Sequence, residues 1–273
     1  MRAIAIVTGI TSPLGQGLAA RLVEDRYHVI GVTRREDATP ASLGVHDRVV
    51  CDLTDADSLQ VAREQLARSC VGIERVWVLH AAGMPVVRAL EELAPEQFEQ
   101  AMWANFMGPV ALTHGLLPTI RATAGRVLWL GSISGRLCAP LLGSYGPPKA
   151  ALKSYSSILD LELAHFGARS IYVELGNVQT GLHSEAATIG ERFPKASSYA
   201  QLYRQVPALA AELQSKAMPL DTAVDQIYAA LTAATPKSVM LVGRDARMRA
   251  ALSRIAPSLF GRIMRRKLGW LPR

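Results

Sequence analysis

The chain has 273 residues, of which 49% are hydrophobic, and a formal net charge of +7 at pH 7. This length and apolar content predict one sizeable α/β domain with a large core. The three cysteines lack metal-ligand spacing and are odd in number, so neither a metal site nor a disulfide framework is expected. The apolar run at the N-terminus is too short for a signal peptide or a membrane span, and a reducing, cytoplasmic setting is expected.

Positive charge is concentrated at the end of the chain. Residues 244–273 hold nine Lys or Arg and one acid, Asp245, and therefore carry +8, which leaves about −1 for the first 243 residues. A nearly neutral body is not expected to bind nucleic acid. The sequence predicts a body over residues 1–243 and a basic tail over residues 244–273.

Short apolar runs alternate with amphipathic segments along the body. The runs predict seven strands, at residues 4–8, 28–33, 48–51, 75–80, 126–130, 171–175 and 239–242. The segments between them predict helices that end near residue 25 and that cover residues 58–67, 95 to about 118, 144 to about 166, and 222–233. This alternation predicts a single-domain, doubly wound Rossmann fold of the α/β class, with a seven-stranded parallel sheet covered on both faces.

A glycine-containing turn joins the first predicted strand to the first helix. A helix N-terminus offers free N–H groups and a positive dipole end, which together suit a phosphate group. Pro13 donates no N–H there, so other groups of the turn must supply the contacts. The alternative is a structural turn that binds nothing. The candidate cofactor contacts in this turn are Gly9, Thr11, Ser12, Leu14 and Gly15.

The stretch from Leu130 to Leu152 holds the candidate catalytic residues. Tyr145 and Lys149 are four residues apart, so they share one face of a helix. A neighbouring cation lowers the pKa of a tyrosine, which would let Tyr145 transfer protons near neutral pH. Ser132 could donate a hydrogen bond to the same substrate oxygen. The alternative is an ordinary helix with an unrelated Tyr and Lys.

These motifs resemble those of the short-chain dehydrogenase/reductase family. Its catalytic pattern is a Ser about thirteen residues before Y-x-x-x-K, and its glycine pattern, T-G-x-x-x-G-x-G, is matched at Thr8, Gly9 and Gly15. Pro147 and Pro148 precede the lysine and suit a first helical turn. The resemblance covers nearly all of residues 1–243. The YGPPKAALKSY stretch and the basic tail resemble 17β-hydroxysteroid dehydrogenase-like members.

The resemblance implies a role for each matched catalytic residue. Tyr145 would transfer the proton, Ser132 would orient and stabilise the substrate oxygen, and Lys149 would hold the cofactor ribose and lower the pKa of Tyr145. Asn105 matches the family's helix asparagine, which holds a water linked to the lysine. The alternative for Asn105 is a mid-helix asparagine without this role.

Arginines at the end of the second predicted strand bear on the choice of cofactor. An acid there would hydrogen-bond the ribose of NAD, but Arg34 and Arg35 occupy the position and Glu36 comes later. Guanidinium groups suit a 2′-phosphate, so NADP(H) is expected. The alternative is a pair of solvated surface arginines.

Other cofactor contacts follow from the resemblance. Asp52, with Leu53 beside it, would contact the adenine, although such an aspartate could equally cap the following turn. Ala82 and Gly83 would let the nucleotide lie close to the backbone, and His80 before them is expected in the core. Val178 and Thr180 would meet the nicotinamide amide or a phosphate.

Residues 181–220 resemble the insertion that covers the substrate in this family. Apolar side chains there and between Ser132 and Tyr145 suit a large apolar or polycyclic carbonyl compound, unless they pack only against one another. These side chains are Leu182, Ile189, Phe193, Tyr199, Leu202, Tyr203, Leu137, Cys138, Leu141 and Leu142.

The sequence therefore predicts an NADPH-dependent ketone reductase, or the reverse alcohol dehydrogenase. The substrate would be apolar, with a polycyclic, polyketide-like or steroid-like ketone as one option. One rival is a dehydratase or epimerase on the same fold, and the other is a dinucleotide-binding regulator without turnover.

Two surfaces predict partners. The helices of Asn105 and Tyr145 carry apolar residues that predict a homodimer or homotetramer, namely Trp103, Phe106, Leu152, Ile158, Leu161 and Leu163. The tail after Pro257 predicts a helix with an apolar stripe, formed by Leu259, Phe260, Ile263, Met264 and Leu268, among cations at Arg262, Arg265, Arg266 and Lys267, with Trp270 and Leu271 beyond. Such a helix would either lie on a membrane surface or pack on the protein's own body.

Overall fold

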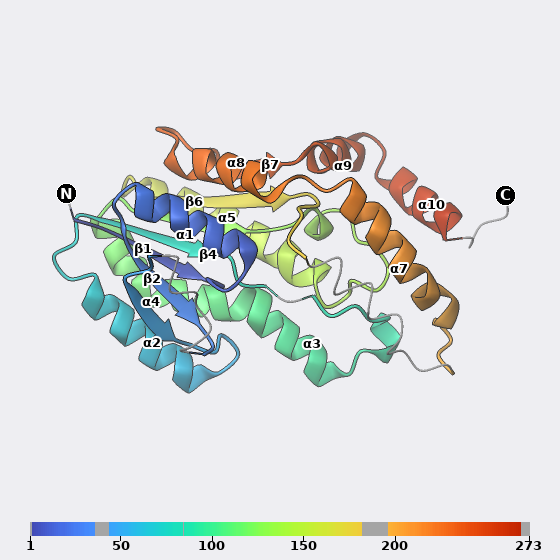
Figure 1. Ribbon diagram of the computed structural model, residues 1–273, viewed down its shortest axis with the longest axis horizontal. Coiled ribbons are helices and arrows are strands. Elements are labelled where there is room, and N and C mark those ends of the chain that lie inside the picture. Colours follow the sequence, from blue (N-terminus) through green and yellow to red (C-terminus); the bar gives the residue numbers. More distant parts are fainter. Residues whose placement is uncertain (1, 36–43, 84, 182–195, 269–273) are drawn as a thin grey trace.

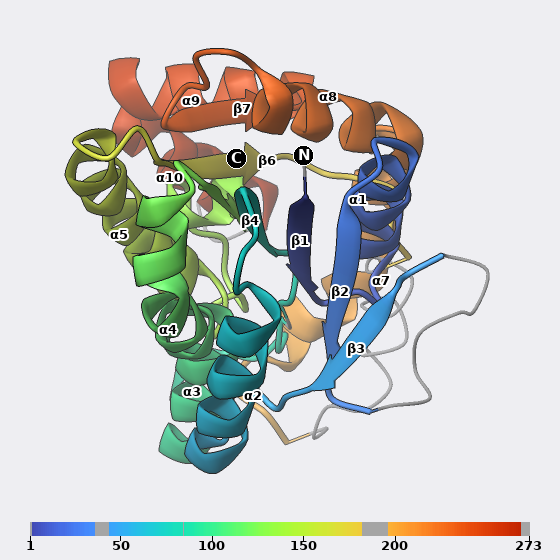
Figure 2. The same cartoon turned by 90° about the vertical axis from the view of Figure 1, so that its left-hand side faces the viewer.

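The computed structural model describes residues 2–35, 44–83, 85–181 and 196–268, and a single parallel sheet runs through its centre. The strand order is β3-β2-β1-β4-β5-β6-β7 (Figure 2). The order reverses between β1 and β4, which creates a crevice at the carboxyl ends of these strands. The seven strands are β1 (Ala3–Thr8), β2 (His28–Thr33), β3 (Asp47–Val50), β4 (Arg75–His80), β5 (Arg126–Leu130), β6 (Arg169–Leu175) and β7 (Val239–Val242).

Helices cover both faces of the sheet, and the predicted doubly wound α/β fold is confirmed. One face is covered by α1 (Pro13–Glu24) and α8 (Leu220–Thr232), and the other by α2 (Ala56–Ser69), α4 (Gly108–Ala122) and α5 (Gly146–Ala164) (Figure 2). Side chains alternate between the two cores: Ile4 and Ile6 of β1 face one of them, and Ala5 and Val7 face the other.

The helical stretch predicted from residue 95 is divided into three parts. It consists of α3 (Pro95–Met102), a π-helical turn (Trp103–Met107) and α4. The helix continues beyond Pro118, where an end was expected. Leu116 and Ile120 are fully buried on either side of this proline, so core packing outweighs the lost backbone hydrogen bond.

Three further helices lie at the end of the molecule toward which the strands run, as Figure 1 shows: α7 (Ala200–Ser215), α9 (Arg244–Ile255) and α10 (Pro257–Lys267). Two short 3₁₀ turns in the described residues are Leu90–Glu92 and Ile133–Gly135. A third apolar cluster joins α7 and the C-terminal segment to two residues from other parts of the chain, Ala89 and Leu141. Its other members are Leu202, Tyr203, Val206 and Leu268.

The apolar stripe predicted on the tail is split between two environments. Leu268 is buried in the third cluster, and Met264 packs against it. Leu259 and Ile263 are 38% and 46% exposed, and Trp270 and Leu271 lie outside the described residues. Among the helices that the structure describes, none is long and apolar enough to cross a bilayer.

The apolar residues expected on an oligomer surface are also divided. Ile158 and Leu161 of α5 are 56% and 78% exposed. Leu152 and Leu163 instead belong to the core beneath α5, because they lie on the side of the helix that faces the sheet. Trp103 and Phe106 are partly buried against the same core.

Candidate active site

The glycine turn after β1 is packed tightly against the end of β4. Gly9 has a φ of 66°, and a Cβ atom there would lie 2.4 Å from the amide nitrogen of Ala82. A Cβ atom on Gly15 would lie 2.3 Å from the carbonyl oxygen of Gly9. The Ser12 hydroxyl caps α1 by accepting a hydrogen bond from the Gly15 N–H, at 3.1 Å. Only glycine fits at positions 9 and 15, and the close packing there brings the N-terminus of α1 to the crevice.

A cavity of about 330 Å³ opens beside this turn. Six residues predicted to hold the cofactor do not line it, namely Leu14, Gly15, Tyr145, Lys149, Val178 and Thr180. The cavity is lined by nine of the predicted residues, which are Gly9, Thr11, Ser12, Arg34, Arg35, Asp52, Leu53, Ala82 and Gly83. Elements distant in sequence thus meet at one crevice, and the close backbone approach at Gly9 fits a phosphate-bearing ligand.

The far wall of the cavity is formed by the ends of β2 and β3. Arg34 and Arg35 are exposed at the cavity, and the Arg35 N–H donates to the Thr33 hydroxyl at 3.4 Å. Asp52 caps the following turn, accepting hydrogen bonds from the Thr54 N–H and hydroxyl at 2.8 and 2.7 Å. Asp52 therefore caps the turn and also lines the cavity, and its contact with the adenine stays a prediction. Glu36 lies outside the described residues.

The segment after β6 is held by a residue that the sequence did not indicate. The Asp245 carboxylate accepts hydrogen bonds from the backbone and side-chain N–H groups of Asn177, each at 2.9 Å. Val178, which follows Asn177, is buried, and its carbonyl oxygen accepts from the Thr180 N–H at 2.9 Å. Asp245 and Asn177 are 68 residues apart, so the sequence alone does not indicate that they are in contact.

Ser132, Tyr145 and Lys149 are brought together at the carboxyl end of β5. Tyr145 immediately precedes α5, and the Lys149 Nζ atom lies 5.5 Å from the centre of the tyrosine ring. The Ser132 hydroxyl accepts from the Ser134 N–H at 3.1 Å, which leaves its own proton free to be donated, and it hydrogen-bonds with the side chain of Tyr145. Lys149 Nζ donates to the Leu130 carbonyl oxygen at 2.9 Å.

The electrostatics of this group differ from the prediction at Tyr145. Burial raises the pKa of Tyr145, and the hydrogen bond with Ser132 opposes that rise only in part. The expected lowering by Lys149 was therefore wrong, because burial disfavours the phenolate more strongly. Burial also lowers the pKa of Lys149 to about 8. The site thus holds a protonated phenol beside an amine of weakened basicity.

Asn105 lies close to this group from the π-helical turn. Its side-chain N–H donates to the Ala101 carbonyl oxygen at 2.9 Å, and the residue is buried. A Cβ atom on Gly83 would lie 3.2 Å from the Asn105 Oδ1 atom and 3.4 Å from Lys149 Nζ. Because Gly83 lines the cavity, these two polar atoms border the same end of it. Single π-turns within α-helices are frequent at functional sites.

His80 occupies the core position that the sequence predicted. Its ring stacks on Trp129 with centroids 4.5 Å apart, and its Nε2 atom is 2.7 Å from the Thr113 hydroxyl oxygen. Burial, together with the charge of Lys149, lowers the pKa of His80 to about 3. A neutral, fully packed imidazole of this kind supports the sheet rather than transferring protons.

Several apolar residues predicted to line a substrate pocket pack against one another in the third apolar cluster. Leu141 and Leu202 are buried in it, Leu141 has a φ of 67°, and its carbonyl oxygen accepts from the Arg88 N–H at 2.9 Å. A positive φ in a leucine is a strained conformation, which is typical of functional loops. Tyr203, also in the cluster, donates its hydroxyl proton to Glu92 at 2.6 Å. Leu182, Ile189 and Phe193 lie outside the described residues.

Histidine, cysteine and carboxylate side chains do not gather into a metal site in the described part of the chain. Within residues 2–35, 44–83, 85–181 and 196–268, no group of three or more His, Cys, Asp and Glu side chains could hold a metal ion. The side chains that line the cavity include hydroxyls, one amide, the guanidinium groups of Arg34 and Arg35, and a single carboxylate, that of Asp52.

Known proteins resemble the chain in sequence and in fold. NADPH-dependent 3-dehydrocapnine reductase of Ornithobacterium rhinotracheale is 25% identical over 248 residues, which cover 87% of each chain. 3-Ketodihydrosphingosine reductase of Bacteroides thetaiotaomicron is 29% identical over 179 residues, which cover 65% of each chain. The crystal structure of a short-chain dehydrogenase from Streptomyces avermitilis superposes with a TM-score of 0.76, at 26% identity and with 94% of each chain covered.

A family model described as short chain dehydrogenase matches residues 3–188. This match spans the glycine turn, the cavity wall and the Ser132, Tyr145 and Lys149 group. The prediction made from the motifs is confirmed. The chain belongs to the short chain dehydrogenase family and is an oxidoreductase.

Proposed function

We propose that this enzyme reduces a ketone on an apolar substrate with NADPH, or oxidises the matching secondary alcohol with NADP⁺. The observation that carries this proposal is the grouping of Ser132, Tyr145 and Lys149 next to a cavity that the glycine turn also lines. Gly83 links the two parts, since it lines the cavity and lies against Lys149.

Each residue has a defined task in this chemistry. Bound NADP(H) would supply the hydride that the carbonyl carbon receives. Tyr145 donates its phenolic proton to the carbonyl oxygen, and its raised pKa keeps that proton in place at neutral pH. Ser132 donates its hydroxyl proton to the same oxygen, and the Ser134 N–H, which donates to the Ser132 hydroxyl oxygen, holds this hydroxyl in place. Lys149 holds the cofactor ribose, and Asn105 holds a water that returns a proton through Lys149 to Tyr145.

The cofactor preference rests on Arg34 and Arg35. Both guanidinium groups border the cavity at the end of β2, in a position suited to a 2′-phosphate. The relative from Ornithobacterium rhinotracheale is an NADPH-dependent reductase by name, which favours the same cofactor here. The rest of the cofactor would be held by the glycine turn, by Asp52 and Leu53, and by Val178 and Thr180.

The substrate class is an apolar ketone, with long-chain ketones placed ahead of polycyclic ones. Leu137 and Leu141, between Ser132 and Tyr145, are apolar and buried, which favours an apolar substrate beside them. Two relatives bear the names of reductases for 3-dehydrocapnine and 3-ketodihydrosphingosine, and the latter is a ketone on a long alkyl chain. A steroid-like or polyketide-like ketone remains in the test set, because an apolar wall accommodates either shape.

Following NADPH absorbance with a panel of ketones tests the proposal. The panel contains 3-ketodihydrosphingosine, a 17-ketosteroid and a small sugar ketone. Consumption of one NADPH per alcohol formed with the first or second compound supports it. Unchanged NADPH together with loss of water from a hydroxy substrate, or with inversion at a carbinol carbon, would replace it with a dehydratase or epimerase. NADPH binding without turnover of any panel member would leave a regulator.

Two surfaces are included in the proposal. We propose that Ile158 and Leu161, exposed on α5, pair with a second copy of the chain in a homodimer or homotetramer. We also propose that α10 makes a peripheral contact with an anionic lipid surface. Leu259 and Ile263 are its exposed apolar residues, and the side chains of Arg262, Arg265 and Arg266 are exposed beside them.

A further inference from the structure

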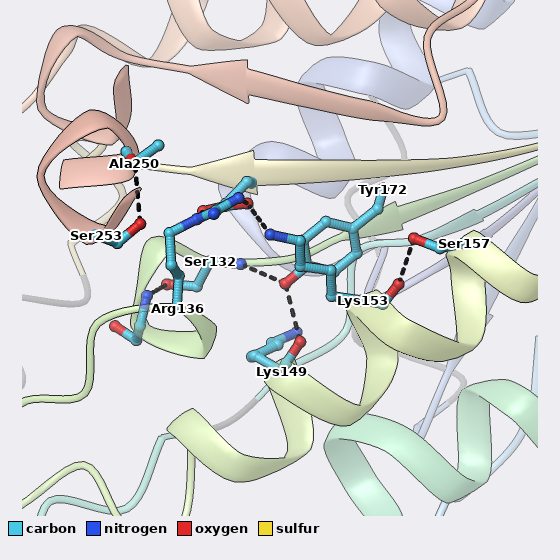
Figure 3. Close-up of polar contacts among 10 residues, drawn as sticks. Ser132, Arg136, Lys149, Lys153, Ser157, Tyr172, Ala250 and Ser253 are labelled. Atoms are coloured by element: carbon cyan, nitrogen blue, oxygen red, sulfur yellow. Dashed lines mark hydrogen bonds and ion pairs between the residues drawn. The ribbon is translucent and has the colours of Figure 1, made fainter. Parts of the chain in front are cut away.

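Two side chains of β6 face the catalytic group from beneath without reaching the cavity. Tyr172 and Glu174 are two residues apart, so they point to the same face of the sheet. Both are fully buried. They lie between the loop that carries Ser132 and the helix that carries Tyr145 and Lys149, as the close-up in Figure 3 shows for Tyr172.

The hydroxyl of Tyr172 joins the backbones of two catalytic residues. It donates to the Lys149 carbonyl oxygen at 3.0 Å and accepts from the Ser132 N–H at 3.2 Å (Figure 3). A Cβ atom on Gly131 would lie 2.0 Å from the Cζ atom of this ring, so the chain before Ser132 rests directly on the phenol. The position of the ring therefore determines where the Ser132 backbone lies relative to α5.

The carboxylate of Glu174 makes a second connection between the same two elements. Its Oε1 atom is 2.5 Å from Arg136 Nε, and its Oε2 atom is 2.8 Å from Lys153 Nζ. Arg136 follows Ser132 by four residues, and Lys153 follows Lys149 by one helical turn. Burial acts to raise the pKa of Glu174, but the two cations outweigh it and the pKa is lowered. The carboxylate is therefore ionised and attracts both elements.

Tyr172 and Glu174 connect the Ser132 loop to α5, and the rate of proton transfer depends on the distance between these two elements. Ser132 follows β5 and Tyr145 precedes α5, and both must reach one substrate oxygen. A displacement of about 1 Å in such a group can cost about 10²-fold in rate. Supporting residues that lock such geometry act through contacts of the kind made by Tyr172 and Glu174.

We propose that Tyr172 and Glu174 are positioning residues that set the separation between the Ser132 hydroxyl and the Tyr145 hydroxyl. This inference rests on the proposed function, because it takes Ser132 and Tyr145 as the groups that act on the substrate oxygen. Neither residue lines the cavity. Their removal should therefore lower kcat and leave cofactor binding and KM nearly unchanged.

The chain offers a matched control for each substitution. Tyr155→Phe removes a phenol from α5 that packs on Trp129, with ring centroids 5.7 Å apart, and that is distant from the Ser132 backbone contact. Asp160→Asn weakens a second ion pair between α5 and β6, in which the carboxylate binds Arg169 at 2.8 Å. Both controls perturb the same helix without touching the Ser132 loop.

The experiment measures kcat, KM, the NADPH dissociation constant and the thermal midpoint of Tyr172→Phe and Glu174→Gln beside these controls. We expect kcat to fall about 10- to 100-fold in both variants, with the NADPH dissociation constant changed by less than about threefold. A drop in kcat for Asp160→Asn or Tyr155→Phe equal to that of its matched variant would show a general packing effect and overturn the proposal.

The pH profile separates positioning from stability. The hydrogen bond from Ser132 lowers the pKa of Tyr145, so a displaced Ser132 should raise that pKa. The ultraviolet titration of Tyr145 is isolated by subtracting the titration of a protein that also carries Tyr145→Phe. In Tyr172→Phe, this titration should move to higher pH, even without substrate. An unmoved titration together with an unchanged kcat would overturn the proposal. Turnover that survives in Tyr145→Phe would instead overturn the proposed function.

Discussion

Lys149 lies one helical turn beyond Tyr145, with its ammonium nitrogen 5.5 Å from the centre of the tyrosine ring. The same nitrogen donates to the Leu130 carbonyl oxygen, so the end of β5 fixes the lysine in place. Burial governs both groups, raising the pKa of the phenol and lowering that of the amine. A protonated tyrosine suits reduction of a ketone, because the carbonyl oxygen must then receive a proton.

Tyr145→Phe is expected to abolish turnover while leaving NADPH binding nearly intact. The ring still packs against its neighbours, but no proton can be donated to the substrate oxygen. Loss of a general acid typically costs about 10²–10⁴ in rate. Steady-state kinetics and a fluorescence titration with NADPH measure the two effects separately, and a near-normal rate in this variant would disprove the assignment of Tyr145.

Replacing both Arg34 and Arg35 with Ala is expected to weaken NADPH binding and hardly affect NADH. The loss of charge-assisted hydrogen bonds worth about 1.5–3 kcal/mol corresponds to about 10- to 150-fold in the dissociation constant. Arg68→Ala, on the exposed side of α2, serves as the control. Equal weakening of both cofactors would mean that the arginines do not bind the 2′-phosphate.

Self-association is expected through α5. Ile158→Glu combined with Leu161→Glu should convert an oligomer to a monomer in light scattering at micromolar concentration, because two charges would be buried at the interface. Val71→Glu is the control, since Val71 is 80% exposed and lies just after α2. A wild-type protein that is monomeric at this concentration would rule out the proposed pairing.

Liposome flotation tests the lipid contact of α10. Arg262→Glu combined with Arg265→Glu should abolish co-flotation with anionic vesicles, because each basic residue near such a surface contributes about 1 kcal/mol. Leu259→Ser combined with Ile263→Ser should weaken it as well, whereas Val61→Ser, exposed on α2, should not. If the wild type fails to float on anionic vesicles, the membrane contact is refuted.

Strand positions were largely predictable, because local apolar runs encode them. The predicted limits of β2, β4, β5 and β7 match the structure residue for residue. The carboxyl ends of β1, β2, β3 and β4 bring the candidate cavity residues together, as parallel topology requires. The split of the tail's apolar stripe was not predictable, because it depends on which side chains of α7 lie opposite.

The contacts that organise the site were much less visible in the sequence. Asp245 and Asn177 are 68 residues apart, and Tyr172 appears in the sequence as an ordinary strand residue. The pKa of Tyr145 was predicted in the wrong direction, since a motif gives the neighbouring charge but not the depth of burial. Tertiary packing decides each of these properties.

Leu268 packs in one apolar cluster with Leu141, which lies between Ser132 and Tyr145. Lys267, its neighbour, forms an ion pair with Glu212 of α7 at 2.5 Å. An affinity tag or fusion partner attached directly after residue 268 would therefore lie next to the apolar cluster that contains Leu141. One placed before β1 begins at the opposite end of the molecule (Figure 1). Activities measured with the two tag positions should not be treated as interchangeable.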